Sequence, residues 1–474
     1  MNGADGRPLA RFGYGRPVVG RVVLVSHRVP AFAGSAAPSG LVTALKPGAT
    51  AFGGLWMGWS GRCVAAAERR LSLGTRANVD YAWLDLTAPE YRHHYAGFCN
   101  QTLWPLLHGL TDRVRGNPED YRAYRSVNHL FAWRLAPLLQ PDDCVWIHDY
   151  HLIPLGAELR ALGVRNRIGF FLHTPCPSPV AWRALPMHGP LLASLRAYDL
   201  IGVQTALDAD GLCRLLTAVA HAPAAEFVAS RIGVFPASIA TGVVAALARA
   251  CDDGMHACRP DRGCQRVLGV DRLDPAKGID RRLAGFDAFL RDHPDRHGRT
   301  ELLQVIPDSR RGVPGYQRLR ARLNARTAAI NARYRQPGWV PVHTMMKGLA
   351  APALIGLYRT ARVALLTPLR DGMNLVAKEY VAAQDPDDPG VLILSRHAGA
   401  ARELAGAVPV DPEDAEQIAY AIERALTLSL PERRQRWSGM YRHLLTHDAL
   451  GWYADFVSAL NSAPCARLSS TPRP

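Results

Sequence analysis

The chain has 474 residues, of which 48% are hydrophobic and 20% charged, and this is typical of a folded globular protein of about two domains. No apolar run reaches the ~18 residues that a membrane-spanning helix needs, and the Gly- and Arg-rich first twenty residues lack the apolar core of a secretory signal. We therefore expect a cytoplasmic protein with no membrane partner.

The net charge of +15 comes almost entirely from Arg, because the chain contains only four Lys residues. A basic protein can bind nucleic acid or phosphorylated small molecules. The Arg residues are scattered along the chain instead of forming a run, which favours small molecules and argues against nucleic acid. Cys251, Cys258 and Cys264 are separated by six and five residues, too far apart for a zinc hairpin, so we expect free thiols and no metal.

Apolar and helical patterns alternate along the chain. Residues 21–26 predict a buried strand, 34–61 a glycine-rich loop with one helix, and 119–138 a helix. Strands are then predicted at 144–148, 167–173, 200–204, 266–270, 302–306, 339–343, 363–366 and 391–394. Helices are predicted between them at 151–162, 181–195, 206–219, 279–290, 316–334, 351–359 and 375–383, and after them at 412–428 and 431–462.

This alternation predicts an α/β protein with parallel sheets covered on both faces, arranged as two doubly wound Rossmann-like domains that face a central cleft. The breakers within 240–264 indicate the linker. We expect a flexible tail at 1–19, an N-terminal domain at 20–250, a C-terminal domain at 251–440, a C-terminal helix at 441–463 that packs back on the first domain, and a flexible tail at 464–474.

The most informative stretch is 365–386. An apolar strand ends there, the Asp371-Gly372 turn follows, and a helix opens at Asn374 and carries Lys378 and Glu379. An open α/β sheet binds its ligand at such a strand end, beside the start of the following helix. Two carboxylates, Asp371 and Glu379, are therefore candidate ligand contacts.

Other predicted strands also end in charged or polar side chains, at Arg28, Asp149, His173, Arg272 with Lys277, and Arg310. Several cations in separate loops indicate more than one phosphate group, since Arg and Lys both bind phosphate. Carboxylates without a Cys/His cluster suit hydroxyl-rich ligands better than a metal. Sugar phosphates meet both demands, although each residue alone has a structural explanation, such as a helix cap for Asp149 or a core position for Trp104.

Four motifs carry a family resemblance. They lie at 54–61 (GLWMGWSG), 146–152 (WIHDYHL), 165–173 (RNRIGFFLH) and 370–386, which includes AKEY at 377–380. With matching order and spacing from about residue 22 to 452, the chain resembles the trehalose-6-phosphate synthases, which are retaining glucosyltransferases of the GT-B type in glycosyltransferase family 20.

The resemblance implies roles for individual residues. Acceptor binding falls to Arg28, Tyr95, Trp104, Asp149 and Arg310. Donor binding falls to Gly40, His173, Arg272, Lys277, Leu349, Asp371, Met373, Asn374, Leu375, Val376 and Glu379. Within this set Arg272 and Lys277 would hold the diphosphate, Glu379 the ribose and Asp371 the donor sugar, while His173 would lie near the reacting centre. Catalysis is expected from Arg272, Lys277, His173 and Asp371.

The implied reaction moves glucose from a nucleotide diphosphate glucose to glucose 6-phosphate with retention, giving α,α-trehalose 6-phosphate. UDP-glucose is the first expectation for the donor, with ADP- and GDP-glucose left open, and no cofactor beyond this co-substrate is expected. A homo-oligomer is left open, and a separate trehalose-6-phosphate phosphatase is expected because the chain has no room for one. Two alternatives are a transferase with another phosphorylated acceptor, such as glycerol 3-phosphate, and a non-catalytic regulatory subunit of a trehalose complex.

Four departures from the usual family sequence bear on rate and donor choice. Ser39 replaces a glycine, His27 an asparagine, Pro275-Ala276 a Tyr-Ser pair, and Ala240 an acidic residue. None of them removes a charged group named above.

Overall fold

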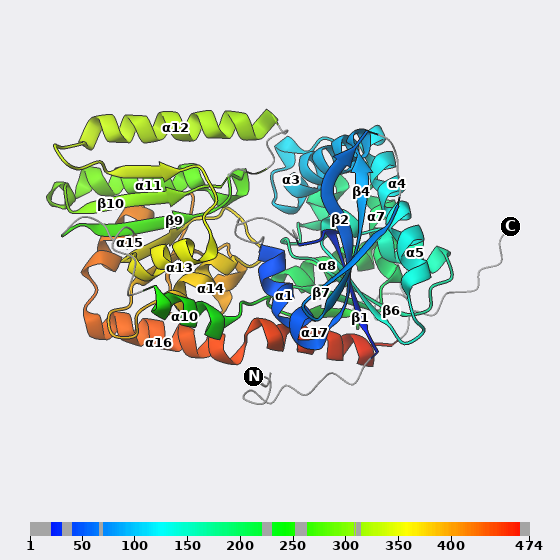
Figure 1. The fold of residues 1–474 in the computed structure, drawn as a ribbon. Coiled ribbons are helices and arrows are strands. Elements are labelled where there is room, and N and C mark those ends of the chain that lie inside the picture. The colour runs from blue at the N-terminus through cyan, green and yellow to red at the C-terminus, as the bar shows by residue number, and fades with distance from the viewer. Residues whose placement is uncertain are drawn as a thin grey trace, which may run out of the picture. The chain divides into compact units, whose positions relative to one another are not determined.

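The computed structural model describes residues 20–30, 40–65, 70–219, 230–251, 263–307, 309 and 314–464. It divides into two compact units (Figure 1). Unit 1 consists of Met1–Phe32, Ala44–Phe235 and Ala449–Pro474, and unit 2 of Ala33–Thr43 and Pro236–Asp448. Each unit contains one sheet with helices on both of its faces.

Unit 1 is built on an eight-stranded sheet in the order β3-β4-β2-β1-β5-β6-β7-β8. Its strands are β1 Val22–Arg28, β2 Gly54–Val64, β3 Ser72–Arg76, β4 Val79–Thr87, β5 Cys144–His148, β6 Arg167–Phe171, β7 Leu200–Val203 and β8 Ile232–Val234. Every neighbouring pair is parallel except β3 with β4. The central strands β5 and β6 are buried almost throughout, as strands covered on both faces must be.

The helices of unit 1 cover both faces of this sheet. They are α2 Ala88–Glu90, α3 Trp104–Leu107, α4 Pro118–Leu135, α5 Leu155–Ala161, α6 Pro179–Arg183, α7 His188–Ser194, α8 Ala206–Val219 and α17 Ala449–Ser462, with a π-helix at Tyr91–Leu103. Helix α1, Gly40–Phe52, belongs to unit 1 from Ala44 onward. α17 packs on the sheet because Trp146 stacks on Phe456, with ring centroids 4.2 Å apart. Gly169 leaves room for the same helix, since a Cβ there would lie 2.8 Å from Leu460.

Unit 2 contains a six-stranded, wholly parallel sheet in the order β11-β10-β9-β12-β13-β14. Its strands are β9 Gln265–Val270, β10 Thr300–Val305, β11 Val342–Met345, β12 Val363–Leu366, β13 Val391–Ser395 and β14 Val408–Val410. Its helices are α10 Thr241–Ala250, α11 Ile279–Asp292, α12 Pro314–Tyr334, α13 Ala351–Thr360, α14 Leu375–Ala383, α15 Ala415–Thr427 and α16 Leu430–Thr446. One core cluster joins α10, α13, α14 and α16 to β9, β12 and β13.

The predicted fold class, α/β of GT-B type with two doubly wound Rossmann-like domains, is confirmed. The expectation of a loop up to residue 61 is wrong, because Gly54–Val64 forms β2 beside β1. Gly58 is what allows this pairing, since a Cβ there would lie 2.5 Å from the Ser26 carbonyl oxygen. The predicted strand at 339–343 begins three residues later, at Val342. In the part of the chain that the structure describes, no helix is long and apolar enough to cross a membrane.

Candidate active site

In unit 1 three of the predicted residues, Arg28, Asp149 and His173, lie at the carboxyl ends of β1, β5 and β6. Arg28 is the last residue of β1, and its guanidinium carbon lies 5.8 Å from the centre of the Trp59 ring. Gly61, which has a φ of +92°, makes room for it, because a Cβ there would lie 2.4 Å from Arg28 Nη2. A side chain at residue 61 would therefore require the Arg28 guanidinium to move.

Tyr95 lies on the π-helix, and its ring stacks on that of His27 in β1. The His27 ring is 4.8 Å from the Tyr95 ring and 4.6 Å from the His151 ring, with interplanar angles of 8° and 21°. Desolvation, then the nearby charges of His151, His94 and Arg28, holds the pKa of His27 well below its usual range. His27 is therefore a neutral ring that places Tyr95 next to the strand bearing Arg28.

Asp149 and His173 follow the adjacent strands β5 and β6 and are hydrogen-bonded. Asp149 has a φ of +74°, uncommon for a residue with a side chain, and its Oδ1 accepts a bond of 3.3 Å from the His173 amide. Its side chain does not cap the following turn, so the structural explanation weighed for it does not hold. Desolvation lowers the pKa of His173 to about 3, and its Nε2 lies 3.1 Å from Nδ1 of His148.

Trp104 lies deeper than these residues. Its ring is buried in the core of unit 1, with its centroid 5.7 Å from that of Tyr150, the residue after Asp149, and 3.8 Å from that of His108. Its contacts are those of a core residue, and they place it beneath the loop that carries Asp149.

In unit 2 the predicted donor residues form a charged cluster at the carboxyl ends of β9 and β12. Lys277 Nζ forms an ion pair with Asp371 and lies 3.9 Å from Oδ1 of Asp271. Asn374 Nδ2 also donates to Asp371, at 3.1 Å. Arg272, whose side chain is 39% exposed, pairs with Asp274 at 3.1 Å. Both cations are thus matched by carboxylates from the same loops.

The start of α14 adds backbone donors to this cluster. Asn374 adopts a φ of +79° and caps the helix, its Oδ1 accepting from the Ala377 amide at 3.1 Å. The first amides of a helix have no partner within the helix and attract anions, which gives Met373 to Val376 a physical reason to face a phosphate. Gly40 also lies near the start of α14, because a Cβ on Gly40 would be 3.7 Å from Leu375 Cδ1.

Glu379 lies one turn further along α14. Desolvation raises its pKa to about 7, while a hydrogen bond of 3.1 Å from the Tyr358 hydroxyl opposes that shift. Leu349 packs against the hydrophobic cluster that contains Tyr358. A carboxylate and an apolar side chain near the start of a helix suit a ribose and its base.

Three of the residues named from the sequence lie outside the described residues, namely Ser39, Cys258 and Arg310. The predicted tails at 1–19 and, beyond its first residue, 464–474 lie outside them too. Among the residues that are described, no group of three or more His, Cys, Asp and Glu side chains is arranged to hold a metal ion. The described cysteines are free thiols, as expected.

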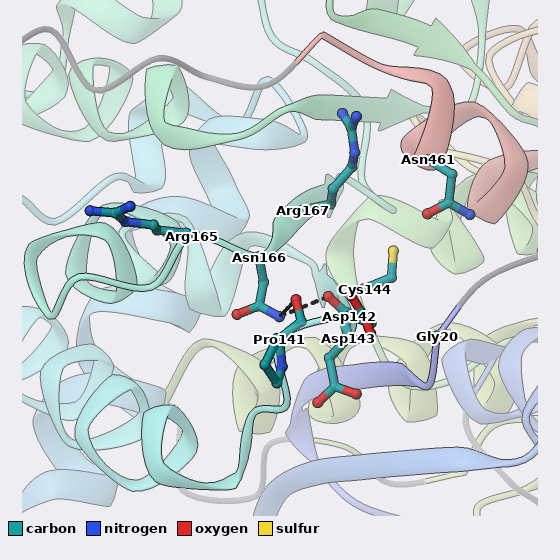
Figure 2. Close-up of a pocket in the computed structure, with 9 residues that line it drawn as sticks. All are labelled: Gly20, Pro141, Asp142, Asp143, Cys144, Arg165, Asn166, Arg167 and Asn461. Carbon is teal, nitrogen blue, oxygen red and sulfur yellow. Dashed lines mark hydrogen bonds between the residues drawn. The ribbon is translucent and has the colours of Figure 1, made fainter.

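A pocket of about 610 Å³ lies away from these residues, at the amino ends of β1, β5 and β6 (Figure 2). It is lined by Gly20, Pro141, Asp142, Asp143, Cys144, Arg165, Asn166, Arg167 and Asn461. Asn166 Nδ2 bonds there to the carbonyl oxygens of Pro141 and Asp143, at 3.3 and 2.9 Å, which ties two loops together. None of the predicted site residues lines this pocket.

Comparison with known proteins identifies the family of the chain. The sequence model of glycosyltransferase family 20 matches residues 26–462. The chain belongs to glycosyltransferase family 20. It is 41% identical to the trehalose-6-phosphate synthase of Sinorhizobium fredii, over 94% of this chain and 98% of that one, and 40% identical to that of Escherichia coli O157:H7, over 93% and 95%.

Solved structures give the same result for this glycosyltransferase. An α,α-trehalose-phosphate synthase (UDP-forming) from Burkholderia xenovorans in complex with glucose-6-phosphate has a TM-score of 0.88 at 37% identity, covering 93% of this chain and 100% of that one. A trehalose-6-phosphate protein from E. coli bound with UDP-2-fluoro glucose has a TM-score of 0.86 at 37% identity, covering 94% and 100%.

Reasoning from the sequence did not identify two buried partners of this family 20 site. Asp271 and Tyr358 contact Lys277 and Glu379, respectively. Asp271 directly precedes Arg272 at the end of β9, so its position could have suggested it. Tyr358 lies inside α13, where an aromatic residue is usually part of the core and gives no functional signal.

Proposed function

We propose that the protein is a retaining glucosyltransferase that moves glucose from UDP-glucose to glucose 6-phosphate and so produces α,α-trehalose 6-phosphate. The relatives above carry the name of this activity over nearly the whole chain. The observation that carries the proposal is the cluster of Lys277, Asp371 and Asn374 at the start of α14, since it unites a cation, a carboxylate and helix amides.

We assign the donor to the cluster in unit 2. Lys277, Arg272 and the amides from Met373 to Val376 would bind the diphosphate, and Asp371 would bind hydroxyls of the glucose. Glu379 would accept hydrogen bonds from the ribose, and Leu349 would contact the base. The donor's negative diphosphate would displace Asp371 from Lys277, which frees that carboxylate for the sugar.

We assign the acceptor to unit 1. Arg28 and Tyr95 would hold the phosphate of glucose 6-phosphate, together with Arg310, and Asp149 would bind sugar hydroxyls. The hydrogen bond between Asp149 and the His173 amide supports this assignment, because it fixes the carboxylate next to the residue that we place near the transferred glucose. Trp104 would support this loop from below.

The chemical step breaks the bond between C1 of glucose and the β-phosphate oxygen, and forms a bond from C1 to the acceptor hydroxyl oxygen on the same face. The acceptor proton passes to an oxygen of the departing diphosphate, so no protein carboxylate has to attack C1. Negative charge grows on the diphosphate, and fixed positive groups around it lower the barrier. We therefore propose Lys277, Arg272 and the α14 amides as the main catalytic groups, with Asp371 and His173 orienting the glucose.

The test is a product analysis in which UDP-, ADP- and GDP-glucose are each offered with glucose 6-phosphate. We expect release of UDP and formation of a phosphorylated non-reducing disaccharide, also with EDTA present. If no donor releases its nucleotide diphosphate, the proposal is overturned. If turnover is faster with glycerol 3-phosphate than with glucose 6-phosphate, glycerol 3-phosphate is the acceptor instead. Lys277→Met should lower kcat by about a hundredfold or more, since electrostatic groups of this kind contribute ~2.7–4 kcal/mol. The exposed Lys347→Met is the matched control.

A further inference from the structure

Unit 2 contains a buried charge directly behind the lysine of its cluster. Arg282, on α11, has a side chain with no exposed surface, although Arg is among the residues least often buried. Its Nη2 pairs with Asp271, and its Nη1 donates to Gln304 Oε1 at 3.4 Å. A buried ion pair adds little to stability on its own, because desolvation of two charges offsets their attraction. This arrangement therefore calls for another reason.

The sheet is shaped to admit this guanidinium. Gly269 on β9 faces it, and a Cβ at that position would lie 2.3 Å from Arg282 Nη1. Arg282 Nε and Gln304 Nε2 are buried without a hydrogen-bond partner, so Asp271 is the principal partner of the guanidinium. The chain thus accepts two unsatisfied polar groups in order to keep this cation beside Asp271.

Asp271 connects the buried Arg to the active-site cluster. One of its oxygens pairs with Arg282, and the other lies 3.9 Å from Lys277 Nζ. Lys277 in turn pairs with Asp371. Positive and negative groups therefore alternate in one row, in the order Arg282, Asp271, Lys277 and Asp371, from the interior of the sheet to the donor side.

This row decides how firmly Lys277 is held. A buried carboxylate with only one cation nearby would draw that cation strongly towards itself, because the interior screens charges weakly. Arg282 pairs with one carboxylate oxygen of Asp271 and offsets its charge. Asp271 therefore attracts Lys277 only weakly through its other oxygen. The lysine can then exchange Asp371 for the oxygens of the diphosphate and still keep its orientation.

We propose that Arg282 is a positioning residue for donor binding, because it balances the charge of Asp271 and leaves the Lys277 ammonium to the donor diphosphate. This rests on the proposed function, in which Lys277 binds that group. Arg282 would act through Asp271 and Lys277 and would not touch either substrate.

The experiment compares Arg282→Met with Arg282→Lys and with Arg281→Met. Arg281 is the neighbour on the same helix and forms a surface ion pair with Glu413, so it is a matched control. We expect Arg282→Met to raise the KM for UDP-glucose and the Kd for UDP about tenfold, as a disrupted buried charge pair can, while the KM for glucose 6-phosphate changes less than twofold. Arg282→Lys should restore most of the donor affinity, and Arg281→Met should resemble the unmodified protein.

A double variant keeps the inference testable if Arg282→Met does not fold. Arg282→Met with Asp271→Asn removes both buried charges, so the competing carboxylate is gone, and the donor KM should return to within threefold of the original. Three outcomes would overturn the inference and leave the function intact. They are equal rises in the KM values for donor and acceptor in Arg282→Met, a donor KM in the double variant as high as that of Arg282→Met, and an inactive Arg282→Lys variant. An unmodified protein that neither turns over nor binds UDP-sugars would overturn the function, and the inference with it.

Discussion

Lys277 and Asp371 are 94 positions apart in the chain and form an ion pair across the strand-end loops of β9 and β12. Their side chains are 12% and 14% exposed, so the pair lies in an environment that screens charge only partly. If both groups bind the donor, as we propose, the ion pair occupies the atoms that each would offer to the substrate. Donor binding would then have to separate the pair.

Asp371→Asn should divide binding from turnover. Loss of the carboxylate removes the competitor for Lys277, so UDP, which has no sugar, should bind as tightly as before or up to about tenfold more tightly. Turnover of UDP-glucose should fall about a hundredfold, since the sugar loses an orienting contact. Calorimetric titration with UDP and steady-state rates measure the two effects. Asp387→Asn, whose side chain is 94% exposed, is the control, and weaker UDP binding by Asp371→Asn would contradict the role of the pair.

The sequence predicted the strand-end placement of the charged residues well. Arg28, Asp149 and Asp371 each follow an apolar run, and parallel strands bring such ends to one edge of a sheet. In the structure Arg28 ends β1, Asp149 directly follows β5, and Asp371 lies in the loop five residues after the end of β12. Gly40 and Leu375, far apart in the chain, are also brought together by α14.

The side-chain partners could not be predicted, because they depend on long-range packing. Tyr95 lies on a π-helix with no clear periodicity, and its stack with His27 and His151 joins three separate segments. Arg282 lies three residues after Ile279 and four before Phe286, so its spacing places it on the buried face of α11 although it is charged. The sequence does not show that Gly269 leaves room for its guanidinium.

The pKa of about 7 at Glu379 predicts pH-dependent binding of the nucleotide. Ribose hydroxyls donate hydrogen bonds, so they bind the ionised carboxylate better than the neutral acid. Affinity for UDP should therefore rise about tenfold between pH 6 and pH 8, with release of a proton on binding below pH 7. Calorimetry in buffers of different ionisation enthalpy measures this proton. Glu379→Gln should bind UDP more weakly at pH 8 and lose most of the pH dependence, and an unchanged slope would contradict the assignment.

The same shift makes a prediction about stability. The folded pKa lies above the usual value of 4.5, so ionised Glu379 costs stability once the pH rises above that value, and the full cost is reached above pH 7. Glu379→Gln should raise the free energy of unfolding by roughly 3 kcal/mol at pH 8, and by much less at pH 5. Urea unfolding at both pH values measures the difference. A stabilisation that is equal at both would indicate a cause other than ionisation.

Gly61→Ala should impair the acceptor half of the reaction alone. The added Cβ would meet the Arg28 guanidinium at 2.4 Å, and a φ of +92° is strained for alanine. Displacement of Arg28 should raise the KM for glucose 6-phosphate about tenfold, with the KM for UDP-glucose unchanged. Gly189→Ala is the control, because nothing lies within 4 Å of its added Cβ. A rise in the KM for UDP-glucose instead would contradict the assignment of Arg28 to the acceptor site.

Four desolvated histidines of unit 1 predict a loss of stability in mild acid. Desolvation lowers the pKa of His27, His94, His148 and His173, so the folded protein resists a proton that the unfolded chain accepts near pH 6.5. Their contribution is present above pH 6.5 and is lost as the pH falls below it, towards the folded pKa values near 3 of His94 and His173. The melting temperature should fall steeply between pH 6.5 and pH 5. His27→Asn, which restores the residue usual in this family, removes one of these titrating groups and should make the fall shallower. An equally steep fall in that variant would show that His27 already takes up a proton in the folded state, and its stack with Tyr95 would then be held by a charged ring.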